Sequence, residues 1–352
     1  MLVELVGGTA ISFIASLIAC RALVARGPRD HPNEDHKEHD APTPTSGGLG
    51  IAAGFVLGLI AVFLSQGPWQ SAAAAHNPVR ALMLLGLATA LLLIGYVDDR
   101  FQLNAAVKFS LFGLLSVAGA LSAGVVEALP LGMTSIYVLP FGAGVFGTTL
   151  WIFTLINSVN FMDGSNGLAM GSMAVGLCTL AAIARVENAP AILAACLCCA
   201  GAVSGFLVWN APAGRLFAGD SGSLFVGAIA ALGALVLIKD RDLSPFVPPI
   251  IFFPPLADTL LTLLWRVQRG RSVFVGHTEH LYQIALRAWP GHVRVAVIYW
   301  VAMALCGALA FYVAREPDPA APWIALTGLA VLSIVISAFM RSWAAARGYL
   351  AP

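Results

Sequence analysis

The chain has 352 residues, of which 59% are hydrophobic and only 11% charged, and its mean hydropathy is +0.85. A soluble domain carries about 25% charged residues, so this composition excludes a soluble globular protein and indicates an integral membrane protein. The net charge of +1 does not by itself indicate a partner, and we expect no nucleic acid to bind. All six cysteines lie in apolar runs without metal-binding spacing, so we interpret them as packing residues.

Apolar runs of about 17 to 25 residues, long enough to cross a bilayer as helices, recur along the chain. We expect an all-α polytopic membrane protein of about eleven spanning helices, forming a single transmembrane domain over residues 1–352. The first run is too long for a signal-peptide core and is counted as a span. The expected spans are residues 2–25, 47–66, 80–97, 106–126, 143–158, 167–184, 189–208, 222–238, 246–265, 293–313 and 321–341.

Polar segments interrupt the apolar runs at five places. They read RDHPNEDHKEHDAPTPTSGG (29–48), GYVDDRFQLNAAVKF (95–109), NSVNFMDGSNGLAMG (157–171), RLFAGDSGSLFVG (215–227) and RVQRGRSVFVGHTEHLYQ (266–283). If the N-terminus lies outside, all five fall on the cytoplasmic side, together with 14 of the 19 Lys and Arg residues. We therefore predict an active site on the cytoplasmic face.

The pair Asp98 and Asp99 ends the third expected span. A solvated helix end is the simplest interpretation, but carboxylates oppose the helix dipole at a C-terminus and repel each other. A functional role is therefore favoured. Lys108, nine residues beyond Asp99, either extends to the interface or binds a phosphate, and the sequence leaves both alternatives open.

Asn157, Asn160 and Asp163 follow one another at intervals of three residues, which places them on one face of a continuing helix. Amides at membrane depth are costly unless they are satisfied, so these side chains serve either a ligand or a hydrogen bond between helices. Gly164 can end the helix and allow a ligand to approach the backbone.

Asp220 stands in GDSGS, which resembles a serine-protease motif but lacks the strands and disulfides of such proteases. It could simply cap the helix 222–238. The flanking glycines leave space at a helix N-terminus, where phosphate binds well, and a carboxylate there suits a divalent cation with a diphosphate.

His277 and His280 follow a cluster of three arginines, Arg266, Arg269 and Arg271. No third ligand of suitable spacing supports a zinc site. Guanidinium and imidazole groups together favour a phosphate or nucleotide, although the cytoplasmic excess of basic residues alone explains the arginines.

Taken together, the five segments, the last of them preceded by Asp258, resemble the polyprenyl-phosphate N-acetylhexosamine-1-phosphate transferase family, glycosyltransferase family 4, over residues 30–285. The resemblance implies a transferase of ten or eleven helices in the bacterial inner (plasma) membrane. Such an enzyme moves an N-acetylhexosamine 1-phosphate from a UDP-sugar to polyprenyl (undecaprenyl) phosphate, releases UMP and starts a lipid-linked glycan. Its partners would be the donor, the acceptor and membrane lipid, and a homodimer stays open. The histidine motif looks nearer the O-antigen branch than the peptidoglycan branch.

The resemblance also implies roles for individual residues. Asp220 matches the ligand of Mg²⁺, with Mn²⁺ as the alternative metal, and Asp98 matches the carboxylate that deprotonates or positions the lipid phosphate. The other matches lie around the donor in the family. Asp99, Asn157, Asn160 and Asp163 match residues around the nucleotide and the metal, and we count Asp99 and Asp163 among the catalytic residues. Lys108 matches a lysine near the donor phosphates, and the flanking motifs contribute Arg271, His277, His280, His39 and Pro42.

The sequence departs from the family at three positions where a basic residue is common, and it has Asp35, Thr45 and Thr278 there. These losses bear on how the donor binds. Two other classes of protein are considered: a membrane transporter, although no matching halves are found, and a lipid-diphosphate hydrolase, which would differ only in using water as acceptor.

Overall fold

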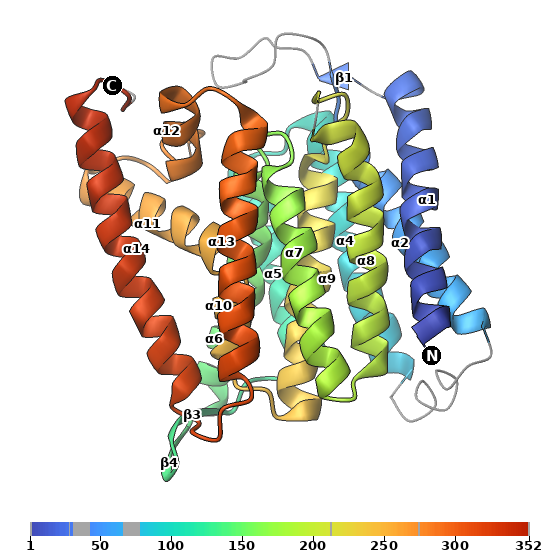
Figure 1. Cartoon of the computed structure of the whole chain (residues 1–352), viewed down its shortest axis with the longest axis vertical. Coiled ribbons are helices and arrows are strands. Elements are labelled where there is room, and N and C mark those ends of the chain that lie inside the picture. The colour runs from blue at the N-terminus through green and yellow to red at the C-terminus, as the bar shows by residue number, and fades with distance from the viewer. Residues whose placement is uncertain are drawn as a thin grey trace.

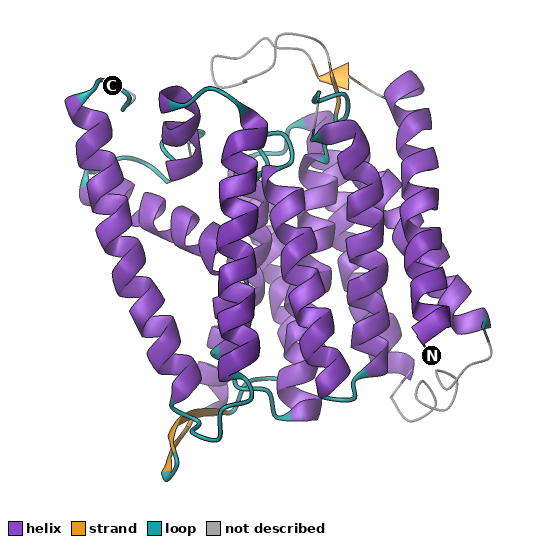
Figure 2. Ribbon diagram, in the orientation of Figure 1, coloured by secondary structure: helices purple, strands orange, loops and turns teal. Residues whose placement is uncertain are grey.

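The computed structural model describes residues 2–27, 29–30, 43–65, 78–211, 213–273 and 275–350. Within these ranges the fold is a bundle of long helices with short strand pairs at its two ends, which confirms the all-α prediction (Figures 1 and 2). The helices are α1 (Leu2–Arg26), α2 (Gly47–Leu64), α4 (Pro78–Phe101), α5 (Ala105–Ala123), α6 (Phe141–Met162), α7 (Leu168–Val186), α8 (Pro190–Asn210), α9 (Gly219–Arg241), α10 (Val247–Ile251), α11 (Phe253–Gln268), α12 (Leu281–Ala288), α13 (His292–Val313) and α14 (Ala321–Ala346).

The strands form two antiparallel pairs. Strand β1 (Arg29–Asp30) pairs with β2 (Thr43–Pro44) at one end of the bundle, and β3 (Ala128–Gly132) with β4 (Ser135–Val138) at the other (Figure 1). We call these the β1 end and the β3 end. The C-terminus lies at the β1 end and the N-terminus at the opposite end (Figure 1).

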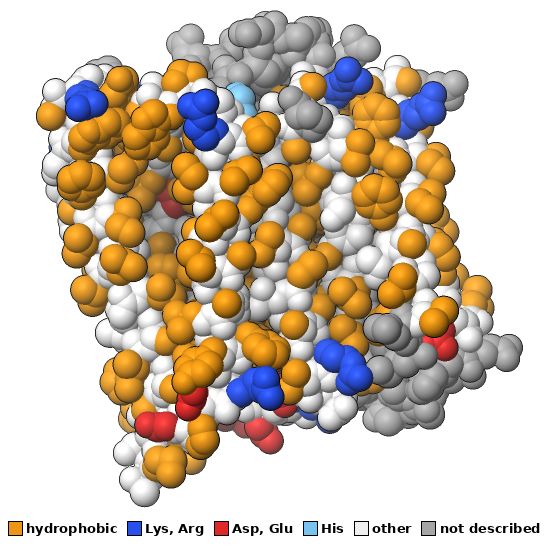
Figure 3. Space-filling view, viewed as in Figure 1, with side chains coloured by type: hydrophobic (Ala, Val, Ile, Leu, Met, Phe, Trp, Pro, Cys, Tyr) orange, Lys and Arg blue, Asp and Glu red, His pale blue; other side chains and the backbone are white. Residues whose placement is uncertain are grey.

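Ten of the described helices are long and apolar enough to cross a membrane: α1, α2, α4 to α9, α13 and α14. In the space-filling view, hydrophobic side chains cover the middle of the molecule, and the visible Lys and Arg side chains lie at its two ends (Figure 3). This distribution is what a bilayer requires of a polytopic protein.

The single span expected over 246–265 is wrong. The chain there forms two helices, α10 and α11, separated at Phe252. Pro254 and Pro255 explain the break, because proline has no N–H to donate and is tolerated only in the first turn of a new helix. The pair still carries the chain from the β3 end, where α9 finishes, back toward α12 at the β1 end (Figure 1).

Helix α9 occupies the centre of the bundle and packs against α2, α4, α6 and α8. The most apolar stretch of α9 is 83% buried, compared with 6% for the peripheral α14. Small residues such as Gly222 and Gly227 allow its neighbours to approach closely. The first N–H groups of α2, at Gly47 and Gly48, donate to the carbonyls just before α9. The start of α9 is therefore held in place by its neighbours.

Candidate active site

Asp99 caps helix α9 from the neighbouring helix α4. Its carboxylate accepts hydrogen bonds from the backbone N–H groups of Asp220 (2.8 Å) and Ser221 (3.2 Å). Gly219 begins α9 with a φ of +69°, a conformation that favours glycine, and a Cβ there would collide with the Asp99 carboxylate. The acidic end of α4 is thus compensated by the positive N-terminus of α9.

Lys108 joins the two other carboxylates of this region. Its Nζ forms ion pairs with both Asp98, from α4, and Asp220, from α9. Asp98 is buried and also accepts a hydrogen bond from the Leu103 N–H (2.9 Å). Helix α5 begins at the N-cap Asn104, whose side chain accepts from the backbone, and this start places Lys108 one turn into the helix. Lys108 therefore faces the carboxylates rather than the interface.

The end of α6 contributes an amide and a carboxylate. Asn160 donates to the hydroxyl of Ser223 in α9 (3.1 Å). Asp163 follows the last helical residue, and desolvation, followed by the negative charges of Asp220 and Asp99, raises its pKa well above the usual range. Asn157 is different: its Nδ2 donates to the carbonyl of Phe153 in its own helix, and its buried Oδ1 has no hydrogen-bond partner among the described residues.

The cluster is rich in negative charge. Four carboxylates, those of Asp98, Asp99, Asp163 and Asp220, interact around one ammonium group, that of Lys108. Within the described ranges, no three His, Cys, Asp or Glu side chains enclose a metal position. Magnesium does not need such a cage, because it commonly takes one or two carboxylates, several waters and substrate phosphates. Asp163 and Asp220 are the residues that could hold it.

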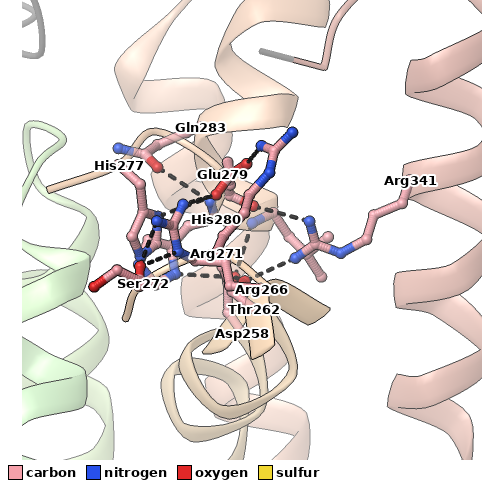
Figure 4. Close-up of polar contacts among 11 residues, drawn as sticks. Asp258, Thr262, Arg266, Arg271, Ser272, His277, Glu279, His280, Gln283 and Arg341 are labelled. Atoms are coloured by element: carbon pink, nitrogen blue, oxygen red, sulfur yellow. Dashed lines mark hydrogen bonds and ion pairs between the residues drawn. The ribbon is translucent and has the colours of Figure 1, made fainter. Parts of the chain in front are cut away.

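A second cluster surrounds residues 269–280, which connect α11 to α12 and which we call the histidine arm (Figure 4). Glu279 is buried and forms ion pairs with Arg266 and Arg271. Desolvation alone would raise the Glu279 pKa, but these two arginines outweigh it and lower the pKa. Arg271 also lies over the Trp265 ring, so it holds the arm together instead of standing free for a phosphate.

The two histidines are stacked on each other at the inner side of the arm. The ring centroids of His277 and His280 are 4.9 Å apart, and His280 also stacks on Tyr282. Both histidines line a cavity of about 160 Å³ together with Phe109 and Phe161. Phe109 directly follows Lys108 and Phe161 directly follows Asn160, so two of the residues that line this cavity are sequence neighbours of residues in or beside the carboxylate cluster.

A larger cavity of about 600 Å³ lies between α2, α4, α8 and α9. Its lining is almost entirely apolar, and its charged members, Arg80, Asp240 and Arg241, lie at the starts or ends of α4 and α9 nearest the β3 end. The rest of its lining is apolar, and the cavity lies toward the β3 end, away from the cluster of Asp98, Asp99, Asp163 and Asp220.

The structure thus places nine of the eleven predicted site residues in two adjoining clusters at the β1 end, with Arg271 held by protein groups. The tenth, Asn157, lies one turn before Asn160 in α6, and its only hydrogen bond described above is to its own helix. The eleventh, His39, lies outside the described residues, as does Pro42. Asp258 was noted only as part of the last motif and was given no role, and Arg341 was missed, although a charged side chain inside an apolar run is a signal for function. Both were within expected spans.

A bundle of membrane-length helices with an acidic site at the ends of four of them defines a polytopic membrane enzyme. The family model of glycosyl transferase family 4 matches residues 81–238. A probable undecaprenyl-phosphate N-acetylglucosaminyl 1-phosphate transferase of Bacillus subtilis (strain 168) is 30% identical over 83% of this chain and 81% of its own. The decaprenyl-phosphate N-acetylglucosaminephosphotransferase of Mycobacterium tuberculosis H37Rv is 31% identical over 86% and 80%.

The chain therefore belongs to glycosyl transferase family 4, the family of polyprenyl-phosphate N-acetylhexosamine-1-phosphate transferases, as its motifs indicated. A phospho-N-acetylmuramoyl-pentapeptide-transferase of Rubrobacter xylanophilus is also similar, at 28% identity over 77% of this chain and 83% of its own. Relatives with both kinds of name are found, so the preference for an O-antigen branch stays a prediction.

Proposed function

We propose that the protein transfers an N-acetylhexosamine 1-phosphate from a UDP-sugar to polyprenyl phosphate and releases UMP. The observation that carries this proposal is the junction of two clusters at one end of the bundle. Carboxylates and a lysine at the starts and ends of α4, α5, α6 and α9 adjoin a cavity lined by aromatic rings and histidines. The N-acetylglucosamine named for two relatives makes UDP-N-acetylglucosamine the first donor to test.

In the proposed reaction, an oxygen of the lipid phosphate attacks the sugar-linked phosphorus of the donor. A new P–O bond forms, the bond from that phosphorus to the bridging oxygen breaks, and UMP leaves with that oxygen and its electron pair. The lipid phosphate is largely ionised at neutral pH, since its second pKa is about 6. Asp98 then orients the phosphate and accepts any remaining proton. Lys108 supplies positive potential where the two anions meet.

A divalent cation, Mg²⁺ or alternatively Mn²⁺, is proposed to bind to Asp220 and Asp163. The negative charge of Asp220 is among the causes that raise the pKa of Asp163, and a cation held by both carboxylates would relieve this repulsion, which supports the assignment. When bound, such an ion neutralises the diphosphate and stabilises the leaving UMP. Asp99 contributes by fixing the backbone of Asp220, and Asn160 contributes by fixing Ser223 one turn further along α9.

We further propose that the β1 end faces the cytoplasm of a bacterium, in its plasma membrane. The excess of Lys and Arg among the connections at this end supports that orientation. The O-antigen or other cell-envelope glycan that the product would enter is likewise a proposal.

The test is UMP release by the purified full chain in detergent, with undecaprenyl phosphate, Mg²⁺ and a panel of UDP-N-acetylhexosamines. Asp220→Asn should abolish release, whereas Asp242→Asn, at the other end of α9, should leave it unchanged because Asn tolerates the left-handed conformation there. A chelator should stop the reaction and added Mg²⁺ restore it. Donor cleavage without the lipid would identify a hydrolase instead, and no cleavage of any donor would contradict the proposal.

A further inference from the structure

Asp258 of α11 is a buried carboxylate outside the carboxylate cluster described above, with 2% of its surface exposed. It accepts hydrogen bonds from the backbone N–H groups of Leu281 (2.8 Å) and Tyr282 (3.1 Å), which are the first two residues of α12. It therefore caps α12 from another helix, as Asp99 caps α9. A free helix N-terminus leaves such N–H groups without partners, so this contact fixes where α12 begins.

The same carboxylate is fixed by two hydroxyl groups. Tyr299 of α13 donates to it at 2.6 Å and Thr262, one turn along α11, donates at 3.2 Å. Arg341 reaches from α14 to donate to the Thr262 hydroxyl (2.8 Å) and to the carbonyl of Glu279 (3.1 Å), as Figure 4 shows. Groups of α11, α12 and α13 therefore hold the Asp258 carboxylate in place.

His280 stands immediately before α12, and its Nδ1 lies 3.5 Å from the Asp258 carboxylate. A carboxylate beside one imidazole nitrogen favours a proton on that nitrogen and leaves the other nitrogen as an acceptor. The ring of His280 lines the cavity that adjoins the carboxylate cluster. Its Nδ1 is buried and has no hydrogen-bond partner among the described residues, and the Asp258 carboxylate beside it also fixes the start of α12.

We infer that Asp258 is the positioning residue of the histidine arm: it holds α12 and sets the tautomer of His280, so that an unprotonated Nε2 accepts a hydrogen bond from the donor substrate in the cavity. This inference rests on the proposed function for the identity of the ligand, but not for the coupling between Asp258 and His280. The group that His280 binds is a hydrogen-bond donor, such as an amide N–H or a hydroxyl.

The first measurement is kinetic and uses Asp258→Asn in the full chain, with undecaprenyl phosphate and the best UDP-sugar. Loss of a carboxylate that orients a histidine commonly costs about 10- to 100-fold. We expect a fall of that size in kcat/KM, carried largely by a higher KM for the UDP-sugar, with the KM for the lipid unchanged. A purely structural role would reduce the amount of folded enzyme, and therefore kcat, without raising the KM for the donor.

A milder variant tests the inference in case Asp258→Asn does not fold. Tyr299→Phe removes one hydrogen bond to Asp258 and should raise the donor KM in the same direction by less. Tyr312→Phe, the same substitution at an exposed position of the same helix, is the matched control and should change nothing.

The second measurement does not need activity. In protein labelled with ¹⁵N-histidine, with the His280 signals assigned by comparison with His280→Gln, Asp258→Asn should move the two ring nitrogens away from the Nδ1-protonated pattern. Unchanged nitrogen shifts, or an unchanged donor KM in active protein, would overturn the inference. If no UDP-sugar is cleaved by the wild-type protein, the proposed function fails while the nitrogen shifts still test Asp258.

Discussion

The two adjacent carboxylates at the end of α4, those of Asp98 and Asp99, have different partners. Asp99 is directed at the backbone of α9, where it satisfies two N–H groups, while Asp98 is directed at Lys108 and the Leu103 N–H. Because successive side chains on a helix point about 100° apart, two neighbours can serve two different partners. The pair therefore combines one carboxylate that caps a helix and one for which we propose a role in the reaction.

This difference predicts different effects for two variants. Asp99→Ala leaves two buried N–H groups of α9 without partners, and we expect the free energy of unfolding to fall by about 1–3 kcal/mol. Asp98→Asn keeps an acceptor for Leu103 and should change stability little while lowering UMP release by about 100-fold or more. We would measure thermal unfolding in detergent and UMP release for both variants to check that one loses stability and the other loses activity. Equal loss of stability in the two would contradict the assignment.

His277 gives the histidine arm a dependence on pH. Desolvation, followed by the neighbouring His280 ring and the positive charges of Arg266 and Arg341, lowers its pKa from 6.5 to about 4, against the opposing effect of Glu279. Between these values the unfolded chain binds a proton at this position that the folded chain does not. Stability must therefore fall as the pH falls from about 6.5 to about 4.

The measurement is the thermal midpoint at about pH 7.5 and about pH 5 for the wild type and for His277→Gln. Other groups titrate in both proteins, so the difference between them isolates His277. The wild type should lose more stability than the variant on acidification, and an equal loss would show that His277 titrates normally in the folded chain.

At the scale of helices, the active site depends on how closely α4 approaches α9. Gly95 lies one turn before Asp99, and a Cβ on it would stand 2.5 Å from the Asp220 carbonyl carbon and the Ser221 nitrogen. These are backbone atoms of the helix that Asp99 caps, and they cannot turn aside as a flexible side chain can. The glycine is therefore what allows the cap to form.

We accordingly expect Gly95→Ala to force α4 away from α9, to destabilise the protein by about 1–3 kcal/mol and to reduce UMP release strongly. Gly86→Ala is the matched control on the same helix, because no atom lies within 4 Å of the Cβ it would add. The measurements are UMP release per folded molecule and the thermal midpoint, compared between Gly95→Ala and Gly86→Ala. Full activity in Gly95→Ala would refute the close-approach argument.

Helix positions were largely predictable from apolar runs, because a bilayer imposes the same length on each span. The failure at 246–265 has a physical reason: hydropathy does not register the missing N–H groups of Pro254 and Pro255. The clustering of Asp98, Lys108 and Asp220 was implied by their motifs, but the mutual ion pairs depend on helix packing that no local pattern encodes. The roles of Asp258 and Arg341 depend on contacts between helices far apart in sequence.

For the molecule as a whole, the bundle has two chemically different ends. The carboxylate cluster and the histidine arm lie at the β1 end with the C-terminus, whereas the other end carries the β3–β4 hairpin and the Arg80–Asp240 ion pair. A soluble nucleotide donor can reach only the end that faces its own compartment. The orientation of the chain in the membrane thus decides which pool of donor the enzyme uses.

That orientation can be measured with single cysteines added to the full chain. Thr134→Cys lies in the exposed turn of the β3–β4 hairpin, and Ala346→Cys is exposed at the end of α14 near the β1 end. Five of the native cysteines are buried and Cys178 lies within the span α7, so the unmodified chain gives the background.

With a membrane-impermeant maleimide on intact bacterial cells, we expect labelling at 134 only. Labelling at 346 should require permeabilised cells, because the positive-inside rule predicts that this end lies in the cytoplasm. Labelling at 346 alone in intact cells would reverse the orientation and remove the site from the cytoplasmic UDP-sugar pool.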